Sequence, residues 1–103
     1  MNIQSLNEYM VKIDLPVEPD DEFVALIPAQ QSHVEGLMRK GILTSYSLSA
    51  DKSTLWITFL SFSEEAVAAT IRHMPMSKYM QPAIMELLFH QMPTHSMPVF
   101  SWN

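Results

Sequence analysis

The length, composition and charge of this chain place it among small globular proteins and exclude several classes of function. Its 103 residues are 48% hydrophobic and 17% charged, which suits a single domain with a single core. Its net charge of −5, with six scattered basic residues, argues against nucleic acid, because that partner needs clustered Lys and Arg. Cysteine is absent, which removes disulfides and thiolate chemistry. Neither a secretory signal nor a membrane-spanning run of ~20 apolar residues is visible, so we expect a cytoplasmic protein with no membrane partner.

The first part of the chain predicts a strand followed by a helical region. Alternating apolar residues predict a strand over Asn7–Leu15, which Pro16 ends. Acidic residues within 18–22 favour a helix start, because carboxylates stabilise the N-terminal amides. Apolar residues then recur at helical spacing until Gly41 supplies a left-handed stop. Pro28 interrupts this pattern, so either one helix kinks there or a short helix ends and a longer one begins.

The rest of the chain predicts a hairpin, a second helix and a last strand. A polar turn joins the strands Leu43–Ser49 and Thr54–Phe62. Serines on one side of the former suit an edge strand, whereas the latter has no polar side and is expected to be buried on both faces. Ser63 is the expected N-cap of a helix over Glu64–His73. The last strand is expected over Ala83–His90 and is again apolar on both sides.

The order β-α-β-β-α-β predicts a ferredoxin-like α+β fold with a four-stranded antiparallel or mixed sheet. Right-handed crossovers place the first and third strands at its centre. Two helices can cover only one face of such a sheet. Because some strands are apolar on both sides, the opposite face of the sheet also needs a cover. We therefore expect a homodimer or a larger homo-oligomer in which the sheets pair face to face. The domain is expected to span residues 1–90, with the arm Gln91–Asn103 packed on a neighbouring subunit.

Several short stretches resemble the muconolactone isomerases. They are Tyr9–Lys12, Leu15–Pro16, Gly41, Met74–Met80, Leu87 and His90. The resemblance covers roughly Tyr9 to His90 and is most specific at Pro75–Met80. It implies a dimeric α+β barrel and a cofactor-free isomerase that shifts a proton on a small unsaturated lactone or organic acid. The chain departs from this family at Gln30–Gln31–Ser32, where family members place acidic residues on the first helix.

Such a reaction needs a base, a donor to the developing enolate oxygen and a cation for the substrate carboxylate. Lys12 is the candidate cation, and its alternative roles are a solvated amine or an ion pair with Glu86. Glu86 interrupts an apolar strand and is a candidate base, or else the partner of Lys12. His90, which matches a family position, and His33, on the first helix, are candidate proton carriers. A lone histidine is more commonly a surface or hydrogen-bonded residue.

Three more residues are candidates for substrate binding: Tyr79, Tyr46 and Gln30. Either tyrosine can donate to an oxyanion, or bury its ring and bond a backbone carbonyl. No metal site is expected, because the histidines have no paired spacing. A copper(I) site of Met92, His95 and Met97 is conceivable, but the nine methionines are more simply core filler.

Three classes of function remain open. The first is a cofactor-free isomerase with a closed pocket lined by Lys12, His33, Glu86 or His90. A cofactor-free monooxygenase is a variant of this class. The second is a non-catalytic or regulatory module that holds an apolar small molecule in a pocket without converging titratable groups. The third is a purely structural oligomer whose clefts are filled by Met and aromatic side chains. The sequence favours a muconolactone-isomerase-like homo-oligomer and leaves its activity open.

Overall fold

The computed structural model describes residues 6–91 and has the predicted β-α-β-β-α-β order. The elements are β1 (Asn7–Asp14), α1 (Asp21–Arg39), β2 (Leu43–Leu48), β3 (Thr54–Ser61), α2 (Glu64–Arg72), the 3-10 turn η1 (Ser77–Tyr79) and β4 (Gln81–Glu86). The sheet has the strand order β2-β3-β1-β4, and every pairing in it is antiparallel. The first and third strands are therefore central, as predicted. The chain has a ferredoxin-like α+β fold.

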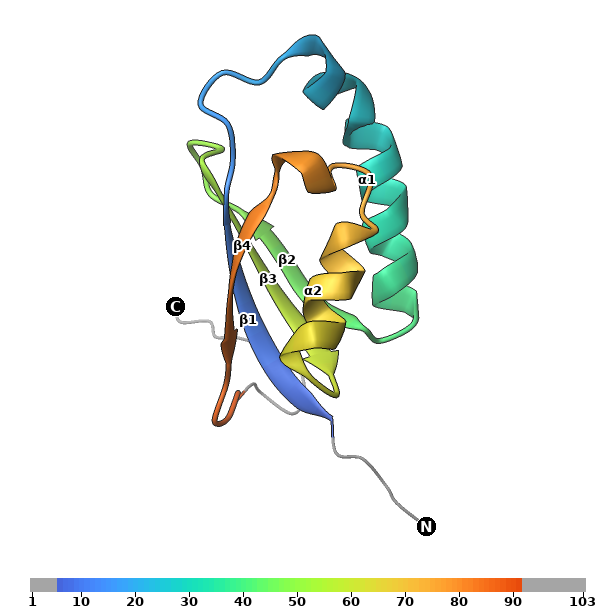
Figure 1. Ribbon diagram of the computed structural model, residues 1–103, viewed down its shortest axis with the longest axis vertical. Coiled ribbons are helices and arrows are strands. Elements are labelled where there is room, and N and C mark those ends of the chain that lie inside the picture. The colour runs from blue at the N-terminus through green and yellow to red at the C-terminus, as the bar shows by residue number, and fades with distance from the viewer. Residues whose placement is uncertain (1–5, 92–103) are drawn as a thin grey trace, which may run out of the picture.

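Both helices lie on the same side of the sheet (Figure 1). Between helices and sheet lies the core, to which the two central strands contribute Tyr9, Val11, Ile13, Leu55, Ile57 and Phe59. The helices supply Val34, Leu37, Val67 and Ile71. Burial of each large aliphatic or aromatic side chain contributes about 1.5–3 kcal/mol. This core fixes which face of every strand points inward.

Helix α1 continues through Pro28, so the region forms one helix and not two. Its first residue follows Asp20, whose Oδ1 accepts a hydrogen bond from the Phe23 N–H at 2.8 Å and so caps the helix. At the other end Gly41 has a φ of 75°, which confirms the predicted left-handed stop. Pro28 is exposed, so its ring projects from the helix without disturbing the core. None of the helices in the described part of the chain combines the length and apolar character needed to cross a membrane.

Strand β4 begins earlier and ends earlier than predicted. It spans Gln81–Glu86 instead of Ala83–His90. The last backbone contact of this segment with β1 is the hydrogen bond from the Leu87 N–H to the Glu8 carbonyl, at 2.8 Å. Beyond it the chain leaves the ladder, although β1 itself continues to Asn7 in pairing with β3. Leu88 is consequently 97% exposed, and the expectation of burial on both sides is wrong at this end of the chain.

Neither helix covers the opposite face of the sheet, which we call the outer face (Figure 1). It is formed by alternate residues of the paired strands, among them Met10, Lys12, Trp56, Leu60 and Met85. Trp56 is 42% exposed and Met85 is 67% exposed, and the Lys12 amine lies 5.7 Å from the centroid of the Trp56 ring. Within residues 6–91 the third strand is thus buried on its inner face, whereas on its outer face Thr58 is buried and Trp56 is exposed. The expected arm, from residue 92 onward, lies outside the described residues, as do Met92, His95 and Met97.

Candidate functional site

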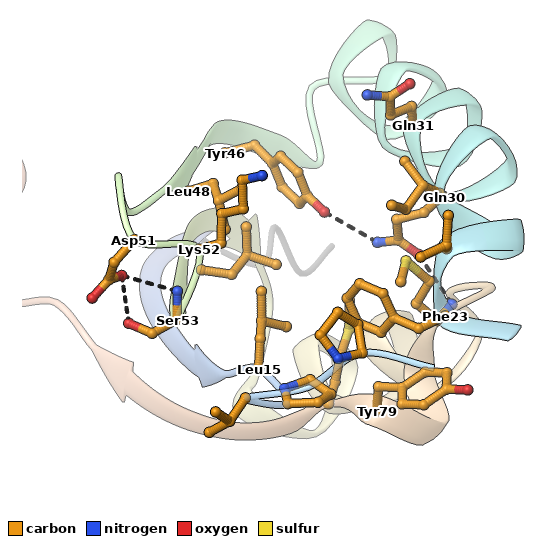
Figure 2. A pocket seen from close by; sticks show the side chains of 18 residues that line it. Leu15, Phe23, Gln30, Gln31, Tyr46, Leu48, Asp51, Lys52, Ser53 and Tyr79 are labelled. Atoms are coloured by element: carbon orange, nitrogen blue, oxygen red, sulfur yellow. Dashed lines mark hydrogen bonds between the residues drawn. The ribbon is translucent and has the colours of Figure 1, made fainter. Parts of the chain in front are cut away.

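A cavity of about 580 Å³ lies between the sheet and α1, at the end of the sheet where the β2–β3 hairpin turns (Figure 2). Its size falls within the range of about 300–1,000 Å³ that is usual for small-molecule sites. Most of the wall is apolar and includes Leu15, Phe23, Ile27, Leu48, Leu55 and Met76. The polar side chains in the wall are Gln30, Gln31, Tyr46, Asp51, Lys52, Ser53 and Tyr79. The cavity therefore suits a small and largely apolar molecule.

Gln30 connects three walls of this cavity. The side chain is only 4% exposed. Its Oε1 accepts a hydrogen bond from the Met76 N–H at 3.1 Å. Its Nε2 donates to the Tyr46 hydroxyl at 3.3 Å and to the Met74 sulfur at 3.4 Å. Both amide hydrogens are therefore used, as a buried amide requires. Gln30 positions its neighbours and has no amide hydrogen left for a ligand.

Tyr46 has a hydroxyl hydrogen available to a ligand. Figure 2 shows its hydroxyl directed toward Gln30, from which the oxygen accepts a hydrogen bond. Its own hydrogen must point elsewhere, and it donates to no other group in residues 6–91. Burial raises the pKa of Tyr46, and the hydrogen bond from Gln30 offsets part of this rise. The phenol thus remains protonated at neutral pH and can donate to a ligand oxygen.

Tyr79 lies elsewhere in the wall, and its hydroxyl is already engaged. It donates to Asp20 Oδ1 at 2.9 Å, while its ring packs edge-on against Phe23 with centroids 5.1 Å apart. Desolvation, followed by the hydrogen bond to Asp20, raises the pKa of Tyr79 to about 12. The pKa of Asp20 is lowered, first by the Phe23 amide and then by the Tyr79 hydroxyl. In this arrangement Tyr79 contributes apolar surface to the cavity and no free donor.

The β2–β3 hairpin supplies the only two charged side chains of the cavity wall among the described residues, Asp51 and Lys52. Asp51 Oδ1 accepts hydrogen bonds from the hydroxyls of Ser49 and Ser53, each at 2.7 Å, and from the Ser53 N–H at 3.0 Å. These bonds lower the pKa of Asp51 to about 2, so its carboxylate is a weak base. Lys52 adopts a φ of 66°, which the serine–aspartate contacts around it help to hold.

The residues predicted as catalytic do not line this cavity. Lys12 is exposed on the outer face beside Trp56. Glu86 pairs in register with Tyr9, an inward-facing residue, so it lies on the opposite face from Lys12. The ion pair considered for Lys12 and Glu86 is therefore not formed, because strand residues three positions apart in register point to opposite faces.

The two histidines are also separate from the cavity. His90 Nδ1 lies 3.1 Å from Glu8 Oε2 in a partly exposed pair, and His33 is partly buried on α1. The described protomer thus does not bring Lys12, His33, Glu86 and His90 into one pocket, and their catalytic roles stay predictions.

The three residues predicted to bind substrate, Gln30, Tyr46 and Tyr79, do line one cavity. The hairpin residues Asp51 and Lys52 were not predicted as part of it. In the sequence these residues indicated only a turn. That turn nevertheless lies at the same end of the sheet as the end of the first strand, where the chain continues toward the helix. No cluster of three or more His, Asp or Glu side chains suited to a metal ion occurs between residues 6 and 91.

No protein-family model and no curated protein matches the chain. Among solved structures, a muconolactone isomerase matches with a TM-score of 0.67 and 25% sequence identity, over 87% of this chain and 97% of that one. A conserved protein of unknown function from Bacteroides thetaiotaomicron, described as a possible oxidoreductase, has a TM-score of 0.45 and 13% identity, over 82% of this chain and 100% of that one. The first of these matches supports the resemblance found in the sequence: the chain has a muconolactone isomerase-like fold.

Proposed function

We propose that the protein binds a small, mostly apolar organic molecule in the cavity and orients it by a hydrogen bond from Tyr46. The observation that supports this proposal is a hydroxyl hydrogen without a partner among the described residues, set in a mostly apolar wall. Few polar groups in an apolar pocket are typical of sites that fix a ligand by one oriented contact. The ligand should carry one oxygen acceptor, such as a carbonyl or an ether.

Binding without turnover is favoured because neither the carboxylate nor the two phenols of the described lining are bases matched to neutral pH. A general base works best when its pKa lies near the pH of the reaction. The pKa of Asp51 is about 2, and those of Tyr46 and Tyr79 are raised above the ordinary value for tyrosine. The open volume of the cavity also argues against a purely structural role, in which Met and aromatic side chains would fill it.

Two probes of matched shape test this proposal, namely 2-acetylnaphthalene and 2-ethylnaphthalene, of which only the first has a carbonyl acceptor. Both should raise the melting temperature of the wild-type protein. Tyr46→Phe should weaken binding of 2-acetylnaphthalene about three- to tenfold, because a net hydrogen bond contributes about 0.5–1.5 kcal/mol. Binding of 2-ethylnaphthalene should be unchanged. The proposal is wrong if neither probe, nor any member of a panel of small ketones, quinones and lactones, binds the wild type.

The second candidate is a cofactor-free isomerase, which the match to muconolactone isomerase favours. Incubation with muconolactone in D₂O, followed by NMR, detects deuterium exchange beside the carbonyl even when net conversion is small. Lys12→Ala, Glu86→Gln, His33→Ala and His90→Ala should each reduce the exchange rate if these residues are catalytic. Oxygen uptake in place of exchange would instead indicate a monooxygenase. Absence of exchange together with probe binding supports the binding function.

We also propose that two copies pair through their outer faces. Exposed apolar side chains such as Trp56 and Met85 are typical of an interface. Strand β1 carries charges of both signs on this face, Glu8 and Lys12, so a second copy in the opposite direction can place unlike charges together. Sedimentation velocity at micromolar concentration should show a dimer that Trp56→Glu dissociates. Met38→Glu, a similarly exposed position on α1, is the control. A wild-type particle of 11.8 kDa would contradict the pairing.

A further inference from the structure

We infer that contacts between η1 and the start of α1 form a clasp that controls ligand access to the cavity. The clasp consists of Asp20, Glu22, Phe23, Lys78 and Tyr79. Phe23 and Tyr79, which meet across it, are both part of the cavity wall. This inference rests on the proposed binding function, because it describes how a ligand reaches that same cavity.

Three contacts hold the clasp shut, and all of them join segments that are distant in the chain. The Tyr79 hydroxyl donates to Asp20 Oδ1 at 2.9 Å. The Lys78 amine lies 2.7 Å from Glu22 Oε1. The rings of Phe23 and Tyr79 meet edge to face, with an angle of 77° between their planes. Together they close the wall between the start of α1 and the turn η1.

The clasp can open without unfolding the helix that it touches. Asp20 Oδ1 accepts two hydrogen bonds, one from the Phe23 N–H within α1 and one from Tyr79. Release of Tyr79 removes only the second, so the N-cap of α1 remains in place. The turn η1 has three residues and no side-chain cap of its own, and its short length favours movement as a unit.

The segment that would move is bounded on both sides by firmer contacts. On one side the Met76 N–H is bound to the buried Gln30 amide at 3.1 Å, and on the other β4 begins at Gln81 in pairing with β1. Between these points lies Lys78, and its side chain and that of its partner Glu22 on α1 are 57% and 58% exposed. Solvated ion pairs of this kind are weak and are screened by salt. The contacts of the clasp are thus weaker than the hydrogen bonds that hold the cavity wall on either side of it.

The double variant Glu22→Gln/Tyr79→Phe tests the clasp while keeping the ring contact with Phe23. Stopped-flow fluorescence with 2-acetylnaphthalene should show association and dissociation rates that both rise about two- to fivefold, the factor expected for loss of exposed contacts. Opening of the clasp raises both rates together, whereas loss of a contact with the ligand would raise the dissociation rate alone. Glu65→Gln, an exposed carboxylate in the first turn of α2, should leave both rates unchanged.

Amide hydrogen exchange gives a readout that needs no ligand. The N–H groups of Tyr79 and Met80 donate to the carbonyls of Met76 and Ser77, each at 3.0 Å. Their exchange should accelerate in the double variant, while that of the Met76 amide, bound to Gln30, should not. Unchanged exchange, or a rise in the dissociation rate alone, overturns the clasp. If exchange accelerates but the protein binds none of the probes, the proposed binding function is wrong. The movement of η1 would then still be supported.

Discussion

Replacement of Gln30 by Leu tests whether one buried amide holds the walls of the cavity together. Leucine has a similar volume but removes all three hydrogen bonds of the side chain. The Met76 N–H then loses its acceptor in a buried position, which costs about 1–3 kcal/mol. Loss of the bond to Tyr46 adds about 0.5–1.5 kcal/mol, and burial of a more apolar side chain offsets part of the sum. We expect a net loss of about 1–3 kcal/mol in the free energy of unfolding, from a total of about 5–15 kcal/mol.

Urea unfolding followed by circular dichroism measures this loss, at one fixed protein concentration because self-association would shift the transition. In thermal unfolding the same loss lowers the melting temperature by about 4–8 °C per kcal/mol for a domain of this size. Gln31→Leu is the matched control, since Gln31 is exposed and makes no side-chain hydrogen bond in residues 6–91. Its effect should stay within about 0.5 kcal/mol. Equal stability of the two variants would refute the reasoning.

The same variant has a second consequence for Tyr46. The hydrogen bond from Gln30 lowers the pKa of Tyr46, whereas burial raises it. Gln30→Leu should therefore raise the pKa of Tyr46 further, and Gln31→Leu should not. A pH titration of the tyrosine ring carbons by NMR measures both. A lower pKa for Tyr46 in Gln30→Leu would mean that water, and not the amide, governs the hydroxyl.

Three further predictions concern local structure. Gly41→Ala should lower the free energy of unfolding in urea by about 1 kcal/mol, because a φ of 75° disfavours L side chains. The added Cβ itself meets no neighbouring atom within 4 Å, and an unchanged midpoint of the urea transition would contradict the prediction. Ser63→Ala should also cost about 1 kcal/mol, since the Ser63 hydroxyl accepts from the Ala66 N–H at 3.1 Å, and Ser63→Asp should retain most of the stability. NMR titration should give a pKa of about 2 for Asp51, against its ordinary 3.8, so its stabilising effect is complete above about pH 4 and is lost as the pH falls through about 2. Ser53→Ala should move this pKa toward 3.8, and no movement would show that the hydroxyl does not bond the carboxylate.

Much of the fold could be predicted because its signals are local. The Ser63 cap and the Gly41 stop depend on residues within a few positions of each other, and the alternation of β1 is visible within eight residues. The end of β4 could not be predicted in this way. Leu88 continues an apolar run, but whether it joins the sheet depends on pairing with β1, which is distant in the chain.

The candidate site was predicted only in part. Tyr46, Tyr79 and Gln30 were expected to bind substrate, and in the structure they line one cavity. The hydrogen bonds of Gln30 to other parts of the cavity wall were not visible in the sequence. Its partners Tyr46 and Met76 lie 16 and 46 residues away, and no local pattern connects them. Lys52 was interpreted only as a turn residue, because no local pattern connects it with the cavity either.

By itself the sequence determined the order of the elements, the Ser63 cap, the Gly41 stop and the inward face of the first strand, because neighbouring residues encode each of these through backbone preference and apolar spacing. Only the tertiary structure decided which polar groups meet. Lys12 and Glu86 were treated as possible partners, yet the register of β1 and β4 turns them to opposite faces. A shift of one residue reverses every side chain of a strand, so contacts between distant segments depend on a register that is set only when the whole sheet forms.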